Sequence, residues 1–474
     1  MKFYHYPIKP RQPVEIYAKL QHFPYSLFFD SADASHQNSQ YSYIAYHPLE
    51  TIEYKDGKVS ITNQQQQLSF IGDPFKVIDE RLNNYRHNFN GHPKLPPFQG
   101  GLAGYFGYDL ARAIEALPMH AQSDPDMPDM AVGIYDRVYV YDHHKEKATL
   151  MIHAKNEQEA KTKLQHFKSL TLSEGENDDH KDSDSTLSTA LDWHASHTKE
   201  SYTKDVEEII KYIYAGDIFQ ANMSQRFYAD LPEDFDPFSH YRHLRQVNAA
   251  PFSGYMNFGD VQISSSSPER FLSLQNNEIE TKPIKGTRPR SKDIAIDQKN
   301  RDDLTASEKD RAENAMIVDL MRNDLSKVCA DYSVTVPALC DIESFATVHH
   351  LVSTINGRLR ADKTAVDLLR GCFPGGSITG APKVRAMEII EEREPQRRGP
   401  YCGSMGYIDF NGNMDTNIVI RTLIYSKNQV SFNVGGGIVA DSVPEAEYQE
   451  TLDKAAALFS SFETYAGAKK KKVA

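Results

Sequence analysis

The sequence predicts an α+β fold built on antiparallel sheets, and three patterns support this prediction. Short segments of strand character, such as "YSLFF", "ETIEY" and "KVSIT", are separated by Gly, Pro and Asp turns. Strand-like runs later in the chain alternate with helical segments and are joined by short turns, of which Asn411-Gly412 is a strong hairpin signal. Hairpins imply antiparallel pairing, so we expect α+β rather than a doubly wound α/β sheet.

Composition and charge narrow the class of protein. The 474 residues are 40% hydrophobic and 25% charged with a mean hydropathy of -0.57, which is typical of a soluble globular protein. We see no apolar run of the roughly 18 residues that a membrane span needs and no secretory h-region, so we expect a cytoplasmic location. The net charge of -12 argues against nucleic-acid binding, and the four widely spaced cysteines predict free thiols.

Changes in composition divide the chain. We expect an N-terminal region at 1–171, an acidic Ser-rich linker at 172–195, the main domain at 196–467 and a basic tail at 468–474. Within the first region, Gly101, Gly104 and Gly107 do not match a dinucleotide fingerprint and are interpreted as turn and packing glycines. A helix is predicted just before Gly216, with one apolar face formed by Tyr202, Val206, Ile209, Ile210, Ile213 and Tyr214.

Two pairs of acidic residues are candidate metal ligands. Asp310 and Glu313 lie three apart in one predicted helix, and Glu447 and Glu450 lie three apart in another, with Lys454 one turn beyond. This spacing places each pair on one helix face. Two such faces brought together would suit Mg²⁺, although solvated acidic faces are the commoner outcome of this pattern.

Two glycine-rich segments are candidate anion sites. In "NVGGGIVADS", Gly435, Gly436 and Gly437 follow directly after a predicted strand, where backbone N–H groups can approach a carboxylate, although a plain turn is equally consistent. In "CFPGGSITGAPKVRAMEIIEE", a loop that contains Ser377 leads into a helix predicted to start near Ala381, with Pro382 in its first turn. The N-terminus of this helix would offer free N–H groups to an anion.

Several single residues beside these motifs are candidate ligand-binding or catalytic groups. Arg421 stands within the strand-like "NIVIRTLIYS", where a buried guanidinium needs an anionic ligand or a structural salt bridge. Tyr401, His350 and Lys383 lie in or next to the same motifs, and a lone histidine is more often a satisfied core residue.

Glu269 and Lys285 are the candidate catalytic pair. Glu269, in "SSSSPERF", stands at a junction of strand and turn, where an apolar surrounding raises the pKa of a carboxyl and suits it to general-acid catalysis. Lys285, in "TKPIKGTRPR", is a nucleophile if desolvated and a surface charge otherwise.

Taken together, the motifs resemble the chorismate-utilising enzymes, a family that includes anthranilate, aminodeoxychorismate, isochorismate and salicylate synthases. The resemblance spans about residues 200–465. It is carried, in order, by "GDIFQANMSQRF", "SSSSPERF", "TKPIKGTRPR", "DRAENAMIVDLMRNDL", "HHLVSTINGRL", "CFPGGSITGAPKVRAMEII", "YCGSMGYIDF", "VGGGIVADS" and "EYQETLDKA". It implies an anthranilate-synthase-like fold, with antiparallel sheets in a sandwich core and helices packed outside.

Two positions discriminate among the activities of the family. Isochorismate and salicylate synthases carry a water-activating lysine where this chain has Gln220. Anthranilate synthases carry alanine where it has Lys285, whereas aminodeoxychorismate synthases carry lysine there. The resemblance therefore favours amination of chorismate to 4-amino-4-deoxychorismate, in p-aminobenzoate and folate synthesis. The alternatives are an anthranilate synthase component and a non-catalytic amino-acid-binding regulatory subunit.

The resemblance also assigns roles to the candidate residues. Mg²⁺ would be held by Glu313 and Glu450 with support from Asp310 and Glu447. Glu269 would be the general acid and Lys285 a covalent nucleophile. Ammonia would come from a glutamine amidotransferase partner, since no glutaminase motif is seen here. A loosely matching amino-acid site is expected near Ser31 and Pro251. Contacts to chorismate would come from His350, Ser377, Tyr401, Arg421, Gly435, Gly436, Gly437 and Lys454.

Overall fold

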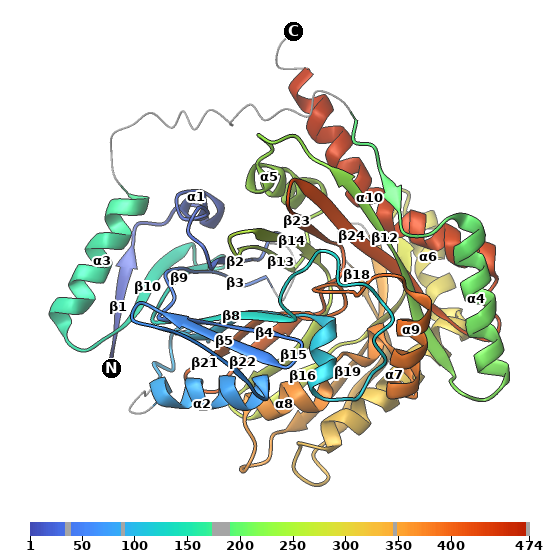
Figure 1. Cartoon of the computed structure of the whole chain (residues 1–474), viewed down its shortest axis with the longest axis horizontal. Helices are drawn as coiled ribbons and strands as arrows, with labels where there is room; N and C mark the ends of the chain where they lie inside the picture. The colour runs from blue at the N-terminus through green and yellow to red at the C-terminus, as the bar shows by residue number, and fades with distance from the viewer. Residues whose placement is uncertain (34–38, 87–90, 173–189, 345–347, 471–474) are drawn as a thin grey trace.

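Two large antiparallel sheets form the centre of the computed structural model (Figure 1). The structure describes the chain except residues 34–38, 87–90, 173–189, 345–347 and 471–474. The first sheet has the order β1 (Lys2–Ile8), β10 (Lys147–Ala154), β9 (Arg137–Asp142), β3 (Tyr41–Ala45), β2 (Ser26–Asp30), β13 (Phe252–Asn257), β14 (Val261–Ser267), β23 (Thr422–Ser426), β24 (Gln429–Ile438), β12 (Gln220–Asp230) and β11 (His194–Ala195), with β20 (Gly380–Ala381) also beside β12.

The second sheet lies against the first. Its order is β17 (Ile284–Pro289), β19 (Val348–Arg358), β16 (Glu278–Thr281), β15 (Arg270–Gln275), β22 (Met414–Asn417), β21 (Ser404–Asp409), β7 (Gly101–Phe106), β8 (Met130–Tyr135), β4 (Glu50–Lys55), β5 (Lys58–Asn63) and β6 (Gln67–Ile71), with β18 (Thr335–Ser344) also beside β19. Both sheets contain strands from either side of the linker, so the two halves share one core, and the predicted domain boundaries stay a prediction.

Helices cover the outer faces of the sandwich (Figure 1). They are α1 (Pro13–Ala18), α2 (Pro74–Arg86), α3 (Glu157–Thr171), α4 (Lys199–Tyr214), α5 (Pro237–Val247), α6 (Ile294–Ala306), α7 (Glu308–Ser326), α8 (Ala365–Cys372), α9 (Lys383–Arg393) and α10 (Pro444–Lys470), with 3₁₀ turns η1 (Tyr108–Ala113) and η2 (Gly376–Ile378). In the described part of the chain, no helix combines the length and the apolar character that crossing a bilayer requires.

Aromatic side chains from both sheets fill the space between them. Tyr407 of β21 stacks on Phe98 with ring centroids 4.4 Å apart and meets Tyr43 of β3 at 5.6 Å. Close backbone approach within the second sheet requires glycine at Gly104, which has φ +153°. A Cβ there would lie 2.2 Å from the carbonyl oxygen of Ala131. The structure thus confirms the predicted sandwich of antiparallel sheets and the interpretation of Gly104 as a packing glycine.

Most predicted elements are present, with three differences. The helix before Gly216 is α4, but Tyr214 is 75% exposed because, five residues after Ile209, it is rotated away from the buried stripe. Residues 468–470 of the predicted tail belong to α10, and the end of the predicted linker contains β11. The remainder of the tail and the acidic stretch 173–189 lie outside the described residues.

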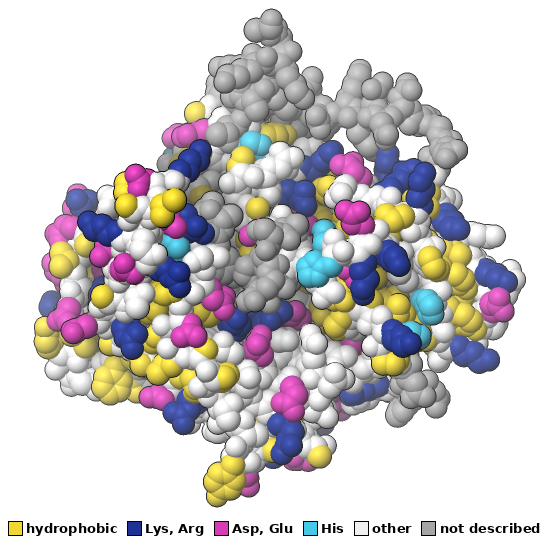
Figure 2. Space-filling view, turned by 180° about the vertical axis from the view of Figure 1, so that it is seen from behind, with side chains coloured by type: hydrophobic (Ala, Val, Ile, Leu, Met, Phe, Trp, Pro, Cys, Tyr) yellow, Lys and Arg dark blue, Asp and Glu magenta, His cyan; other side chains and the backbone are white. Residues whose placement is uncertain are grey.

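All four cysteines are free and buried, as predicted. Viewed from behind, the surface carries basic and acidic side chains interspersed rather than segregated by sign (Figure 2).

Candidate active site

The site lies where the chain crosses from one sheet to the other. Glu269 stands between β14 of the first sheet and β15 of the second, and Arg421 precedes β23 after the return from β22. The two crossings lie side by side, because the backbone N–H of Ile418 donates to the Glu269 carbonyl oxygen (3.0 Å) and that of Ser266 to the Arg421 carbonyl oxygen (3.1 Å). The sandwich itself therefore holds an acid and a base together between its layers.

Glu269 and Lys285 meet at one serine. Ser377 Oγ donates a hydrogen bond to Glu269 Oε1 (2.8 Å), and Lys285 Nζ donates to the carbonyl oxygen of Ser377 (3.1 Å). Ser377 lies in η2, while Lys285 lies on β17, the edge strand of the second sheet. Residues far apart in sequence thus form one acid–amine pair.

Burial shifts both groups toward their neutral forms. Loss of solvent raises the pKa of Glu269 to about 7, against the lowering effects of the Ser377 hydrogen bond and of the Lys285 and Arg421 charges. Loss of solvent also lowers the pKa of Lys285, and the negative charges of Glu313, Glu269 and Glu450 oppose this. Near neutral pH the carboxyl can therefore donate a proton, and the amine loses its proton more readily than an exposed lysine.

The four predicted metal-binding acids come from two helices, α7 and α10. Glu447 and Glu450 of α10 approach β24 at Gly436, where a Cβ would lie 3.2 Å from an oxygen of each. Burial raises the pKa of Glu313 on α7, and the charges of Asp310 and Glu447 raise it further, so both helices contribute to the same electrostatic environment.

The side chains of these acids are engaged elsewhere. Asp310 accepts a hydrogen bond from Arg288 (3.2 Å), Glu450 pairs with Lys454 (2.6 Å) and Glu447 accepts one from Ser442 (2.6 Å). Across the residues that the structure describes, no three His, Cys, Asp or Glu side chains are gathered as a ready metal site. Oxygen donors and mutual repulsion nevertheless fit a hard cation in this region, since a positive ion would offset the repulsion.

Arg421 differs from its predicted setting. It is not inside a strand but adopts a left-handed conformation (φ +51°) just before β23. Burial lowers its pKa, opposed by Glu269. Within the described ranges its guanidinium makes no ion pair or side-chain hydrogen bond, so the structural salt bridge weighed as the alternative is not observed. A partly buried guanidinium with no described ion pair, electrostatically coupled to Glu269, is suited to bind an anionic group.

His350 and Tyr401 lie near the pair on ordered elements. His350, buried on β19, shares a hydrogen bond with Thr287 Oγ1 through Nδ1 (2.8 Å), two residues from Lys285 on the neighbouring strand. Tyr401 is buried beside Cys402, whose thiol pKa responds to the Glu269 charge. His350 is thus linked to the strand that carries Lys285, whereas no hydrogen bond described for Tyr401 reaches Glu269 or Lys285.

The prediction for the first glycine-rich segment needs correction. Gly435, Gly436 and Gly437 lie inside β24 rather than after it. Close packing explains glycine there, because a Cβ on Gly435 would lie 2.2 Å from the Met223 carbonyl oxygen of β12. Lys454 Nζ donates to the Gly435 carbonyl oxygen (2.8 Å).

The helix predicted near Ala381 is α9, which begins at Lys383 with Pro382 as its N-cap residue. Lys383 donates to the carbonyl oxygens of Cys372 (3.0 Å) and Pro374 (2.7 Å) and pairs with Asp324 (2.5 Å). It therefore anchors the preceding loop and does not present its charge to an anion at the helix N-terminus.

Sequence reasoning missed several residues around Ser377. Asn222 Nδ2 donates to the Ser377 carbonyl oxygen (3.3 Å). Arg398 and Glu394 form a buried ion pair next to it. The sequence "EREPQRRG" resembles a solvated charged run, and only the i, i+4 spacing of Glu394 and Arg398 hinted at a pair. Gln220 stands where other members of the family carry a water-activating lysine. Its side chain is fully buried, and neither amide atom has a hydrogen-bond partner among the described residues.

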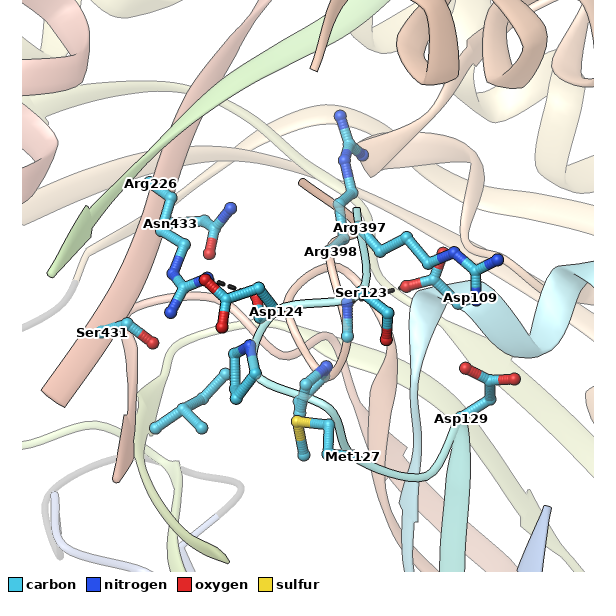
Figure 3. Close-up of a pocket in the computed structure, with 14 residues that line it drawn as sticks. Asp109, Ser123, Asp124, Met127, Asp129, Arg226, Arg397, Arg398, Ser431 and Asn433 are labelled. Carbon is cyan, nitrogen blue, oxygen red and sulfur yellow. Dashed lines mark hydrogen bonds and ion pairs between the residues drawn. The ribbon is translucent and has the colours of Figure 1, made fainter. Parts of the chain in front are cut away.

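Two cavities have linings that include neither Glu269, Lys285 nor Ser377. Ser31 and Pro251 line one of about 70 Å³, together with Tyr41 and Tyr407, so the predicted amino-acid site has a cavity, and its ligand stays a prediction. The other, of about 20 Å³, is close to the size of one water molecule. It is lined by Asp109, Asp124, Asp129, Arg226 and Arg397 (Figure 3).

The fold and the site together place an acid and an amine at the crossing between two sheets, an arrangement suited to acid–base chemistry on an anionic substrate. A family model described as chorismate binding enzyme matches residues 25–460. The chain belongs to the family of chorismate binding enzymes.

Named relatives come from two branches. The chain is 43% identical over 438 residues to aminodeoxychorismate synthase component 1 of Escherichia coli (strain K12), covering 92% of this chain and 93% of that protein. It is 38% identical over 457 residues to anthranilate synthase component 1 of Thermus thermophilus, covering 95% of each. Among solved structures, anthranilate synthase component I from Streptococcus pneumoniae TIGR4 matches with a TM-score of 0.79 and 33% identity, covering 89% of this chain and 92% of that chain.

Proposed function

We propose that the chain aminates chorismate at ring carbon C4 to give 4-amino-4-deoxychorismate, through a covalent intermediate on Lys285. The observation that carries the proposal is the contact of Lys285 and Glu269 with the same residue, Ser377, combined with burial that favours a neutral amine and a protonated acid. The similarity to aminodeoxychorismate synthase component 1 supports it. This buried pair also speaks against a non-catalytic subunit.

The proposed chemistry consists of two allylic displacements. The Lys285 amine bonds to ring carbon C2, both conjugated ring double bonds shift, and the C4 hydroxyl takes the Glu269 proton and leaves as water. Ammonia then adds at C4, both double bonds shift back, the C2–N bond to Lys285 breaks, and the new ammonium group returns a proton to Glu269. The amine is nucleophilic only when neutral, which the lowered pKa favours. The acid must hold its proton at working pH, which the raised pKa favours.

The remaining side chains are proposed to hold the substrate. Arg421 and Tyr401, with the backbone near Gly436, would bind the pyruvyl carboxylate. Glu313 and Glu450, with Asp310 and Glu447 in support, would hold Mg²⁺. The ion would supply positive charge that offsets the repulsion between the substrate carboxylate and these acids.

The proposal also covers the source of ammonia and the location of the protein in the cell. The relatives named component 1 suggest a second component for this chain, and we propose a glutamine amidotransferase, because ammonia in neutral solution is mostly protonated. A cytoplasmic location is consistent with this chemistry. Pathway placement follows from the product, a precursor of p-aminobenzoate and folate.

Product analysis tests the proposal. Purified protein is incubated with chorismate, ammonium and Mg²⁺, and the products are separated by chromatography, with and without a lyase that forms p-aminobenzoate. We expect aminodeoxychorismate, converted to p-aminobenzoate only when the lyase is present. Fluorescent anthranilate formed without the lyase would instead assign the chain to the anthranilate branch.

A further inference from the structure

A buried ion pair lies next to the segment that contains Ser377. Glu394, just after α9, and Arg398 are 5% and 2% exposed at their side chains. Arg398 Nη2 donates to Glu394 Oε1 (2.6 Å) and Nε donates to Glu394 Oε2 (2.9 Å), which is a bidentate arrangement. Arg398 also lines the small cavity that Arg226 and Asp124 line (Figure 3).

The remaining hydrogen bonds of the pair join two other segments of the chain. Arg398 Nη1 donates to the Ile378 carbonyl oxygen (3.0 Å), and Nη2 donates to the Asn222 carbonyl oxygen (2.6 Å). Glu394 Oε1 accepts from the backbone N–H of Ser224 (2.8 Å) and from its hydroxyl (2.9 Å). One charged pair thus connects β12, η2 and the segment that follows α9.

Both segments hold Ser377. Ile378 is its neighbour in η2, and Asn222 donates from Nδ2 to the Ser377 carbonyl oxygen (3.3 Å). The Asn222 N–H also donates to the Thr379 carbonyl oxygen (2.7 Å). Ser377 in turn contacts Glu269 and Lys285. A continuous chain of hydrogen bonds therefore runs from the ion pair to both catalytic groups.

We propose that Glu394 and Arg398 are positioning residues, which fix Ser377 and through it orient Glu269 and Lys285. A guanidinium suits this task because its planar, rigid donors address several acceptors at defined angles, whereas a lysine ammonium does not. This proposal rests on the proposed function for the reaction that Glu269 and Lys285 carry out. The hydrogen bonds that connect the ion pair to Ser377 are independent of that function.

The alternative is that the pair serves stability alone. Buried ion pairs are weak contributors to stability, because desolvation of both charges offsets their attraction. The chain offers a matched comparison in Arg112 and Glu391, which pair at 2.5 Å, with side chains 12% and 8% exposed. Glu391 also stands on α9, but its other hydrogen bonds come from the backbone N–H groups of His120 and Ala121. None of the hydrogen bonds described for this second pair reaches Ser377.

The test is the pH dependence of kcat for Arg398→Lys. Chorismate consumption is measured at saturating chorismate and constant free ammonia, so the readout does not depend on which product forms. If Ser377 shifts, Glu269 loses a hydrogen bond that lowers its pKa. The alkaline limb of the pH profile of kcat, where Glu269 loses its proton, should then shift by about one unit to higher pH. The size follows because a hydrogen bond to a charged group contributes about 1.5 kcal/mol. We also expect kcat to fall about tenfold or more through misorientation.

Further variants make the result decisive. Ser377→Ala removes the hydrogen bond directly and should move the limb in the same direction. The double variant should add little to either single shift, because both act through one contact. If Arg398→Lys does not fold, Glu394→Gln takes its place as the test. Glu394→Gln keeps the shape of the pair and should give a smaller shift in the same direction. The controls Arg112→Lys and Glu391→Gln should lower thermal stability and leave the limb in place.

An unchanged limb in both Arg398→Lys and Glu394→Gln, with losses no larger than in the controls, would overturn the positioning role. Additive shifts in the double variant would also contradict it. Failure of the proposed function would appear separately, as a different product of the wild-type protein.

Discussion

The burial of Glu269 predicts that replacing it by glutamine stabilises the folded protein at alkaline pH. The folded state holds its pKa at about 7, against an ordinary value of 4.5. A rise of about 2.5 in pKa corresponds to about 3 kcal/mol, since each pKa unit is worth about 1.4 kcal/mol. Glutamine keeps an oxygen for the Ser377 hydrogen bond but carries no charge to desolvate.

The sign follows from proton linkage. Below the ordinary pKa the carboxyl is protonated in both states and contributes no penalty. As pH rises toward 7, the unfolded carboxyl ionises while the folded one keeps its proton, so the wild type loses stability. The advantage of Glu269→Gln should grow from under about 1 kcal/mol at pH 5 to about 3 kcal/mol at pH 8.5.

Urea denaturation at several pH values measures this difference, with fluorescence of the single tryptophan, Trp193, as the probe. Trp193 packs against Phe432 and Phe462, so its environment changes on unfolding. Glu391→Gln is the control, and it should be less stable than the wild type at pH 8.5 because it breaks the ion pair with Arg112. A difference between Glu269→Gln and wild type that does not change with pH would refute the reasoning.

Three further substitutions have defined outcomes. Gly436→Ala places a methyl group 3.2 Å from both α10 carboxylates and should weaken Mg²⁺ binding about tenfold or more by calorimetry; unchanged affinity would contradict the proposed ion position. Arg421→Lys should raise the KM for chorismate about tenfold with a smaller effect on kcat, and the opposite split would argue against carboxylate binding. Gly104→Ala should lower the free energy of unfolding by more than about 2 kcal/mol, because its Cβ would meet the Ala131 carbonyl oxygen; a neutral thermal shift would count against the close approach.

Local patterns predicted the elements well, because capping and periodicity are local. The helix α7, for instance, starts at the N-cap Ser307, whose side chain accepts from the Asp310 N–H, and so places Asp310 and Glu313 as their spacing predicted. The raised pKa of Glu269 was also expected from its junction of strand and turn. Neighbouring residues determine the start of α7, whereas the burial that raises the pKa of Glu269 depends on the packing of the two sheets.

Long-range pairing could not be predicted. The sequence does not show that β7 lies between β8 and β21, or that β14 and β15 belong to different sheets and leave Glu269 at the crossing. The glycines at 435–437 resembled a turn because their packing partner, β12, is about two hundred residues away. The contact between Arg398 and Asn222 could not be predicted for a similar reason, because the two residues are 176 positions apart.

The most direct test of the account is whether Lys285 forms a covalent bond with the substrate. Protein mixed with chorismate and Mg²⁺, without ammonia, is quenched rapidly in acid and digested, and the peptide containing Lys285 is examined by mass spectrometry. We predict a mass increase equal to chorismate minus one water, absent in Lys285→Ala and discharged when ammonium is added. An unmodified peptide, together with amination by Lys285→Ala at the wild-type rate, would contradict covalent catalysis by this lysine.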